Sequence, residues 1–463
     1  MRFKVGGALV LLLFCAAIAA VEGRSAAFVM KPYLQLGTDP RAGALSVVWL
    51  TTDEEARWSV EATRARAGSV SMARVRLWGR CYRQYSASLV GSGEFEYAVL
   101  RDGRVEMRAR AQAPPRPGES FQAVVMGDLG PGTGAERAVA SAVHRDAPGL
   151  VVIAGDIAYP RGTHGDNLRN VHAVYNTDRL MPGIGVPLMR SVIFAAAPGN
   201  HDVPVNRERS ISLDRWPDAL AYFYDWVQPL NGPTVPGPRL DGDAARVADF
   251  LASSDRRFPR MGTYSFDWGC AHFTVLDSTR AVDWTDPALR RWIVADLESA
   301  RGAAWRFVVF HHPPFHSSRT HASDQWMRTL SDVFERGHAD VVFAGHVHNY
   351  ERTHPLRFRA RKGGDGLLVA ADGRVDGEFT LDRTFDGVRK TRPDGVLYIT
   401  TGAGGANLYD GEKQASPRQW QPFTACLVSQ TWSFTDLRVD ARRVLLRQLD
   451  IEGKELDRVV VTR

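Results

Sequence analysis

Cysteine is scarce in this sequence, with four residues in 463. One of them, Cys15, lies in an N-terminal segment that we expect to be removed. The other three are Cys81, Cys270 and Cys426. Three cysteines exclude more than one disulfide within the mature chain and leave a spare thiol. The sequence does not indicate which pair forms a bridge, if any does.

Long apolar runs are equally scarce, because only the first 20 residues contain one. Arg2 and Lys4 precede an apolar core from Ala8 to Ala20, which ends on small residues. This pattern is typical of a secretory signal peptide, which we place at residues 1–24. The core is short for a bilayer span, so we expect cleavage and export rather than anchoring. No later segment is long and apolar enough to predict a membrane span.

Dense runs of one charge are absent as well. The formal charge of +6 comes from scattered arginines, and a modest positive field of this kind helps to recruit anionic substrates. A basic surface without a role explains the charge equally well. The apolar content of 44% and the charged content of 24% are ordinary for a soluble globular protein, and 463 residues favour two domains.

Two kinds of pattern divide the chain. Residues 27–112 contain short alternating stretches separated by polar turns, which predicts a small all-β sandwich domain. A proline-rich linker follows at residues 113–119. Residues 120–463 alternate apolar strands with helical patterns, which is typical of an α/β domain. Within this domain we expect helices over 133–144, 286–300 and 323–337, a loop-rich insertion at 203–260 and a β-rich tail at 361–463.

Five apolar runs in the second region each end on a residue type that binds metals. Runs of this length predict strands buried on both faces, as in parallel sheets. Ligands bind beyond the carboxyl ends of such strands, so strands that lie side by side would bring these side chains to one rim. The run ends are Asp128, Asp156, Asn200, His311 and His346, with His348 two residues further on.

The order of these residues is the informative feature, because each of them alone is weak evidence. A Gly-Asp pair after a strand is common turn chemistry, and an isolated histidine is more often a core or surface residue. Two cations roughly 3.5–4 Å apart need a shared carboxylate to offset their repulsion, and Asp156 is the candidate bridge. Asp128 and Asn200 would then lie on opposite metals, and imidazoles suit zinc, iron and related ions. The sequence therefore predicts a two-metal hydrolase.

The five motifs resemble those of the purple acid phosphatases, within the calcineurin-like metallophosphoesterase superfamily. The resemblance covers the chain from about residue 31 to the end. It implies a four-layer β-sandwich flanked by helices for the second region and a fibronectin III-like N-terminal domain, an α/β fold with an all-β addition. The motifs stand here as GDLG from Gly127, GDIAY from Gly155, GNHD from Gly199, VVFH ending at His311 and GHVH from Gly345.

This resemblance implies a dinuclear centre with Fe(III) and one divalent metal, either iron, zinc or manganese. Most relatives place a histidine two residues after the first aspartate, and here that position is Gly130. Tyr159, three residues after Asp156, would supply the missing ligand as a phenolate, a hard anion that suits ferric iron. A tyrosine buried for packing is the alternative. By resemblance, Fe(III) is held by Asp128, Asp156, Tyr159 and His348, and the divalent metal by Asp156, Asn200, His311 and His346.

Three further histidines are candidate catalytic residues. His201 and His321 resemble the outer-sphere histidines of the family, which stabilise the transition state, one of them donating a proton to the leaving group. His316 lies on the same loop as His321 and is the weaker candidate, since an exposed residue without a role is the alternative. Asp202 stands where the family usually has glutamate, which leaves the ligands intact and makes rate and metal preference less predictable.

We therefore expect an exported acid phosphatase that cleaves phosphate monoesters by attack of a metal-activated hydroxide. A phosphodiesterase or nucleotide hydrolase on the same core is one alternative. A non-catalytic secreted binding protein is another, although such proteins normally lose ligands. The expected partner is a small phosphorylated substrate rather than nucleic acid. We expect the protein in an extracellular or periplasmic compartment, or in one of vacuolar or lysosomal type. The natural substrate and the oligomeric state stay open, with a dimer among the options.

Overall fold

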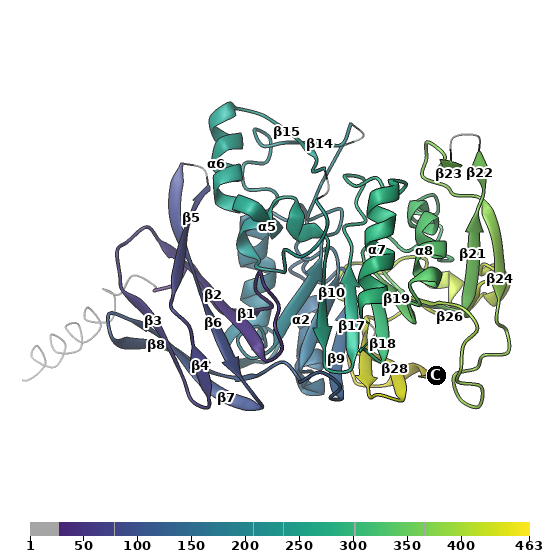
Figure 1. Cartoon of the computed structure of the whole chain (residues 1–463), viewed down its shortest axis with the longest axis horizontal. Coiled ribbons are helices and arrows are strands. Elements are labelled where there is room, and N and C mark those ends of the chain that lie inside the picture. The colour runs from purple at the N-terminus through teal and green to yellow at the C-terminus, as the bar shows by residue number, and fades with distance from the viewer. Residues whose placement is uncertain are drawn as a thin grey trace, which may run out of the picture.

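The structure is a computed structural model that describes residues 27–463, except residues 78, 207, 235, 301, 364, 365 and 368. The predicted signal peptide at residues 1–24 lies outside the described residues. Figure 1 shows a strand-rich N-terminal part beside a larger part in which helices cover sheets. None of the helices in the described part has the length and hydropathy that a membrane crossing requires.

The N-terminal part consists of two antiparallel sheets that share an aromatic core. Trp49 and Tyr85 of one sheet stack with their ring centroids 5.5 Å apart, and Trp58 of the other sheet lies 5.7 Å from Trp49. The expected all-β character of this part is confirmed. The first sheet contains β1 (Met30–Gln35), β2 (Ala44–Thr52), β4 (Ala65–Ala67), β5 (Ser71–Leu77) and β6 (Arg80–Gly91), and the second contains β3 (Trp58–Ala62), β7 (Glu94–Arg101) and β8 (Arg104–Gln112).

Two large mixed sheets form the rest of the fold. In the first, β13, β10 and β9 are parallel and the last three strands of the chain pair antiparallel beside them. Its strand order is β13 (Ile193–Ala197), β10 (Leu150–Ala154), β9 (Phe121–Met126), β27 (Ser433–Val439), β28 (Arg443–Asp450), β29 (Glu455–Thr462). The order in the second is β16 (Tyr264–Trp268), β17 (Ala271–Val275), β18 (Trp305–Val309), β19 (Val341–Ala344), β25 (Leu397–Thr401), β20 (Tyr350–Thr353), β26 (Thr424–Val428).

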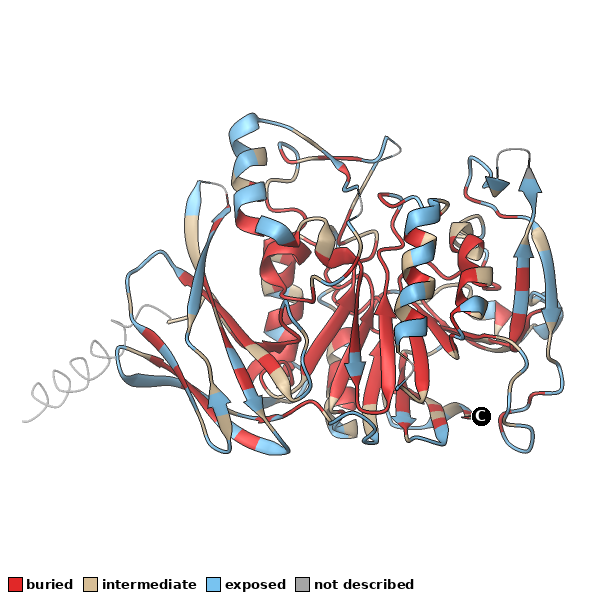
Figure 2. Ribbon diagram, viewed as in Figure 1, coloured by how far each residue is buried: buried red, intermediate tan, exposed pale blue. Residues whose placement is uncertain are grey.

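The large sheets pack face to face and carry helices on their outer sides, which confirms the four-layer α/β fold. Val125 of β9 and Phe343 of β19 belong to one buried cluster between the sheets. On the outer face of the first sheet, Val124 packs in a cluster with α2 (Gly134–Asp146). On the outer face of the second, Val342 packs with α7 (Pro287–Ser299) and α8 (Ser331–Arg336). Figure 2 shows this central stack of strands as almost wholly buried.

The five ligand-bearing runs do not lie side by side in one sheet. Three of them are β9, β10 and β13 of the first sheet, and two are β18 and β19 of the second. Apolar patterning identifies buried strands but not their partners, and the chain passes to a new sheet after the insertion. The two rims nevertheless meet, because Gly127 N donates to Thr401 O at 2.9 Å and a Cβ on Gly127 would lie 3.0 Å from the Gly345 Cα.

Two of the three expected helices in this part are confirmed, and the third is different. Thr133 caps α2 and Asp286 caps α7, as their sequences predict. The segment from Ser323 begins with a turn and becomes helical only at η4 (Trp326–Leu330), a 3₁₀ helix that leads into α8. The prediction of a helix from residue 323 was wrong because Asp324 points to two histidines instead of capping a helix.

The insertion at 203–260 contains more regular structure than expected. Its longest element is α6 (Ala244–Ser254), which Asp243 caps, and its aromatic residues Tyr222, Phe223, Tyr224 and Trp226 are buried as part of the local core. It also contains β14 (Ser210–Ser212), α5 (Tyr222–Asp225), β15 (Arg239–Asp241) and η2 (Asp255–Arg257). The remaining elements are α3 (His164–Asp166), η1 (Asn167–His172), α4 (Ala173–Tyr175), β11 (Asn176–Met181), β12 (Gly185–Pro187), η3 (Arg260–Gly262), β21 (Leu356–Ala360), β22 (Lys362–Gly363), β23 (Gly366–Leu367), β24 (Gly377–Leu381), η5 (Gly411–Lys413) and η6 (Pro417–Gln419).

The three cysteines of the described chain are free thiols. Cys81 lies in β6, Cys270 in the turn between β16 and β17, and Cys426 in β26. No two of these cysteines form a disulfide bridge in this structure.

Candidate metal centre

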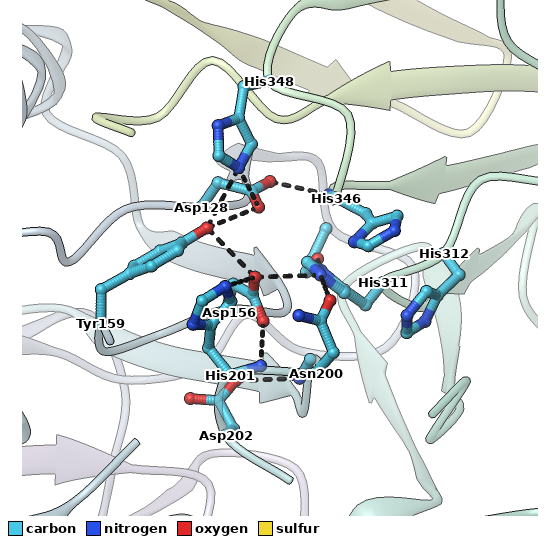
Figure 3. A network of polar contacts seen from close by, with 12 residues as sticks. Asp128, Asp156, Tyr159, Asn200, His201, Asp202, His311, His312, His346 and His348 are labelled. Carbon is cyan, nitrogen blue, oxygen red and sulfur yellow. Dashed lines mark hydrogen bonds and ion pairs between the residues drawn. The ribbon is translucent and has the colours of Figure 1, made fainter. Parts of the chain in front are cut away.

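Seven polar side chains converge where the rims of the two large sheets meet (Figure 3). They come from both sheets, because the strands that precede them end at the facing rims. The structure thus brings together every residue that the sequence proposes as a metal ligand. The seven are Asp128, Asp156, Tyr159, Asn200, His311, His346 and His348.

The Tyr159 hydroxyl lies at the centre of one half of this cluster, here called the tyrosine side and made of Asp128, Tyr159 and His348. The hydroxyl is 2.9 Å from Asp128 Oδ1, 3.1 Å from Asp156 Oδ2 and 3.2 Å from His348 Nε2. Burial and the two carboxylates raise the pKa of this phenol well above its usual value. A cation held by the same oxygens would act in the opposite direction and favour the phenolate.

The other half, the asparagine side, is made of Asn200, His311 and His346. His311 Nε2 lies 3.0 Å from Asn200 Oδ1 and 3.2 Å from Asp156 Oδ2, while its Nδ1 lies 2.9 Å from the Ala154 carbonyl oxygen. Although burial opposes it, the Asp156 carboxylate raises the pKa of His311 to about 9. Nδ1 donates to the carbonyl, so the Nε2 proton is the one that a metal would displace. Asp156 contacts both sides, as a bridging carboxylate must.

The two histidines of the last motif are each held through one ring nitrogen. His348 Nδ1 is 2.6 Å from Asn407 O, its Nε2 is 3.3 Å from Asp128 Oδ1, and its ring stacks on Tyr409. His346 Nε2 is 3.1 Å from Asp324 Oδ2, which leaves Nδ1 for a metal. Such hydrogen bonds fix the orientation of an imidazole and select its ligating nitrogen.

Three of the candidate ligands adopt a left-handed backbone conformation that non-glycine residues rarely use. The φ angles are 61° at Asp128, 51° at Asp156 and 67° at His346. Each such residue costs on the order of 1–2 kcal/mol in backbone strain. Strain of this kind concentrates at functional sites, where the fold aims side chains at a ligand.

The charge of the cluster fits a site for cations. Asp128 and Asp156 are 0% and 1% exposed, and their only ion pairs in the described part of the chain are to histidines. Buried carboxylates of this kind are normally paired with cationic groups or bound to metals. Carboxylate, phenol, amide and imidazole groups are also the donors that iron, zinc and manganese accept. The residues present therefore fit a pair of metal ions.

The structure explains why position 130 holds glycine. A Cβ on Gly130 would lie 2.2 Å from the Ile157 carbonyl oxygen and 3.0 Å from the Val171 side chain. The Gly130 carbonyl in turn accepts the Tyr159 N–H at 2.9 Å. A side chain at position 130 is therefore excluded by the same loop that carries Tyr159 into the cluster.

Asp202 organises the loops behind the cluster. Its carboxylate accepts hydrogen bonds from the N–H groups of Gly199 at 2.9 Å and Ile157 at 3.1 Å. It therefore joins the loop of Asn200 to the loop of Asp156. Burial and the neighbouring Asp156 charge raise the pKa of Asp202 to about 7.

The three candidate catalytic histidines differ in position. His201 Nε2 lies 3.8 Å from Asp156 Oδ2, and His321 packs with its ring centroid 3.9 Å from that of His346. Each has about a third of its side chain exposed, 33% for His201 and 32% for His321, so both face the open side of the cluster. His316 is buried, contrary to the exposed alternative, and among the described residues it makes no hydrogen bond or ion pair with the seven.

Sequence reasoning missed Asp324 and gave no role to His312. Asp324 Oδ2 lies 3.1 Å from both His321 Nδ1 and His346 Nε2, so one carboxylate orients a candidate ligand and a candidate catalytic residue. His312 packs 4.4 Å from His346 between ring centroids and contacts Ser278 Oγ through Nδ1. The only sequence signal for Asp324 was its place three residues after His321, which looked like the start of a helix.

Comparison with known proteins agrees with this geometry. The calcineurin-like phosphoesterase family matches residues 121–350. Purple acid phosphatase 23 of Arabidopsis thaliana is 28% identical over 298 residues, which cover 60% of this chain and 51% of that protein. The chain thus matches about half of the length of that relative. Probable inactive purple acid phosphatase 27 of the same plant is 26% identical over 180 residues, which cover 37% of this chain and 25% of that protein.

A solved structure shows the same fold. Purple acid phosphatase PPD1 from yellow lupin (Lupinus luteus) seeds superposes with a TM-score of 0.61 at 16% identity, over 93% of this chain and 74% of that one. The family match lies on the two sheets that carry the cluster, and the structural match extends over the N-terminal sandwich as well. The chain therefore contains a calcineurin-like phosphoesterase domain, and it is similar to the purple acid phosphatases.

Proposed function

We propose that this protein is an exported phosphatase that hydrolyses phosphate monoesters at a dinuclear metal centre. The observation that supports this most directly is the Tyr159 hydroxyl, which lies within 3.2 Å of Asp128, Asp156 and His348. A tyrosine placed for packing alone would not need three titratable partners. Its position favours ligation over the packing alternative.

The donor sets follow from the two sides of the cluster. The tyrosine side offers a carboxylate, a phenol and an imidazole, and the asparagine side offers an amide oxygen and two imidazoles, while the Asp156 carboxylate serves both. The first set suits Fe(III), and the second suits divalent iron, zinc or manganese. When bound, such a pair of cations neutralises the phosphoryl oxygens and activates the attacking water. The Fe(III) set is Asp128, Asp156, Tyr159 and His348, and the divalent set is Asp156, Asn200, His311 and His346.

The protein's own acid–base groups flank this centre. His201 is anchored by Nδ1, which lies 2.6 Å from the Pro160 carbonyl oxygen, so Nε2 faces the cluster. His321 is anchored by Nδ1 to Asp324. Both imidazoles can donate a proton to the leaving oxygen or a hydrogen bond to a phosphoryl oxygen. We assign His201 and His321 to these roles. We assign His316 no role in contact with substrate, because it is buried and makes no hydrogen bond or ion pair with the seven residues.

A visible spectrum combined with iron analysis tests the metal assignment. Tyrosinate bound to Fe(III) gives an absorption band, so the purified protein should be coloured and Tyr159→Phe should lose the band while it keeps its fold. Phe223→Tyr, a change in the buried core, is the matched control and should keep the band. A colourless wild-type protein that contains iron would overturn tyrosinate ligation.

A pair of esters tests the reaction class. We expect faster turnover of p-nitrophenyl phosphate than of bis(p-nitrophenyl) phosphate, with optimum activity at acidic pH. Faster turnover of the diester would instead indicate a phosphodiesterase on the same core. Absence of stoichiometric metal and of turnover would instead indicate a non-catalytic binding protein. N-terminal sequencing of the exported protein would test cleavage of residues 1–24.

A further inference from the structure

A cavity of about 430 Å³ lies beside the metal centre and is not used by the proposed chemistry. Its wall comes from the loop after β17, from η4, from the insertion, and from Leu367, residues 369–371 and Gly373. A volume of this order is typical of sites for small organic ligands. The lining residues with polar or aromatic groups that matter here are Arg209, Arg280, Asp283 and Trp326.

One wall of the cavity comes from a loop at the same sheet rim as the metal centre. Strand β17 runs parallel to β18, so the loop that carries Arg280 leaves the sheet beside the loop that carries His311. Arg280 Nη2 is 3.5 Å from Asp324 Oδ1, and the other oxygen of Asp324 contacts His346. The wall of the cavity and the divalent-metal site are therefore separated by one carboxylate.

Trp326 forms a second connection. Its ring centroid lies 4.7 Å from that of His312, which packs against His346. On the other side, the Arg280 guanidinium lies 4.5 Å from the Trp326 ring. This cation–π contact holds Arg280 at the boundary between the cavity and the cluster.

The positive groups of the cavity are only partly neutralised. The Arg280 side chain is 45% exposed, and its one ion pair in the described part of the chain, to Asp324, is long at 3.5 Å. Its Nη2 also donates a hydrogen bond to the Asp372 carbonyl oxygen at 3.3 Å. Arg209 is exposed and makes no ion pair within the described part of the chain. Asp283, the acidic residue of the wall, already accepts the N–H and hydroxyl of Thr285. The remaining N–H groups of Arg280 and those of Arg209 are therefore available to an added anion, and guanidinium N–H donors match a carboxylate or a phosphate.

We propose that this cavity receives the leaving group of the phosphoester and selects esters whose leaving group carries a second anionic group. The inference rests on the proposed function, because it places the scissile phosphate at the metal centre. A carboxylate or phosphate on the leaving group then forms ion pairs with Arg280 and Arg209. With a neutral leaving group, the two arginines stay solvated and form no such pair. The insertion contributes to this selection of substrates through Arg209, which lies next to β14.

Two esters of equal shape test this selection. In 4-carboxyphenyl phosphate the leaving group is anionic, and in 4-carbamoylphenyl phosphate a neutral amide replaces the carboxylate. We expect the wild-type protein to show a kcat/KM about tenfold higher for the carboxylate ester, since hydrogen bonds to a charged group are stronger than those to a neutral amide. Arg209→Gln should lower this ratio several-fold, and Arg280→Gln should abolish it and also slow both esters through Asp324.

A remote arginine supplies the matched control. Arg110→Gln, an exposed position on β8 of the N-terminal sandwich, should leave the ratio unchanged. A wild-type ratio near one, or an Arg209→Gln variant that slows both esters equally, would overturn the inference while the phosphatase assignment stands. If the wild-type protein hydrolyses neither ester nor p-nitrophenyl phosphate, the proposed function itself is overturned, and the selection with it.

Discussion

The tyrosine side and the asparagine side of the metal centre are built by different means. On the tyrosine side one donor joins the others, because the Tyr159 hydroxyl contacts both Asp128 and His348. On the asparagine side His311 contacts Asn200, whereas His346 is held by Asp324, a carboxylate that belongs to none of the five motifs. A change at Asp324 should therefore affect the asparagine side first.

The largest effect should come from Asp156, which serves both sides. Asp156→Asn removes the shared charge, so we expect loss of both metals and a decrease of kcat/KM by roughly 1000-fold or more, equivalent to several kcal/mol. Metal analysis and steady-state kinetics check this. Asp39→Asn, exposed on the N-terminal part, is the control. Full metal content in Asp156→Asn would contradict the bridging role.

A change at Asp324 should separate the two sides. Asp324→Ala frees His346 and His321, so we expect the affinity for the divalent metal to fall about 10- to 100-fold while the tyrosinate band stays. Asp324→Asn keeps an acceptor oxygen and should recover part of the affinity. Titration of the divalent metal, followed alongside the visible spectrum, measures both. Equal loss at the two sides would show that they are not independent.

The stability of the protein should depend on pH through Glu351, whose partner Ser317 lies on the loop that follows His311. Its carboxyl accepts hydrogen bonds from Ser317 N and Thr424 Oγ1, and burial raises its pKa to about 7. Because this value is above that of an unfolded glutamate, its contribution to stability is complete below about pH 4.5 and is lost as pH rises towards 7.

Glu351→Gln tests this assignment. The variant should lose less stability than the wild-type protein between pH 5 and pH 8, by roughly 1–3 kcal/mol. Urea unfolding at the two pH values measures the difference. Parallel pH profiles for the two proteins would exclude ionisation of Glu351 as the cause.

The smallest effect should come from Asp202, which joins the loop of Asn200 to the loop of Asp156. Asp202→Glu introduces the residue that is usual in the family, but the buried position fits the shorter aspartate side chain. We expect a stability change of about 1–3 kcal/mol from overpacking and an activity change below about tenfold. Thermal unfolding and kcat check these values. A change of metal content in this variant would show that Asp202 also positions the ligands.

The same contrast explains how much the sequence could predict. The tyrosine side was predictable, because each of its donors follows a strand or stands at a fixed spacing from Asp156. The buried strands and the helices that begin near Thr133 and Asp286 were also predictable, because they depend on local patterns, which a single sequence contains. The four-layer arrangement came only from the resemblance to the metallophosphoesterases.

The asparagine side was predictable only in its ligands. The contact of Asp324 with His346 joins residues 22 apart, and no local pattern indicates it. The division of the five strands between two sheets is likewise a matter of strand partners, which apolar runs do not specify. His316 was misplaced for a similar reason, because burial of a loop histidine depends on distant segments that cover it.

The cluster lies where two facing sheets meet, so its assembly requires both sheets to form. Its donors are spread from Asp128 to His348, and the last strands of the chain, β27 to β29, complete the sheet beside β9. A ribosome must therefore pass His348, and the three strands that complete the sheet of Asp128 must pair, before the full set of donors can hold an ion. Metals bound by this cluster would accordingly come from the compartment in which the chain folds, rather than from the one in which its synthesis begins.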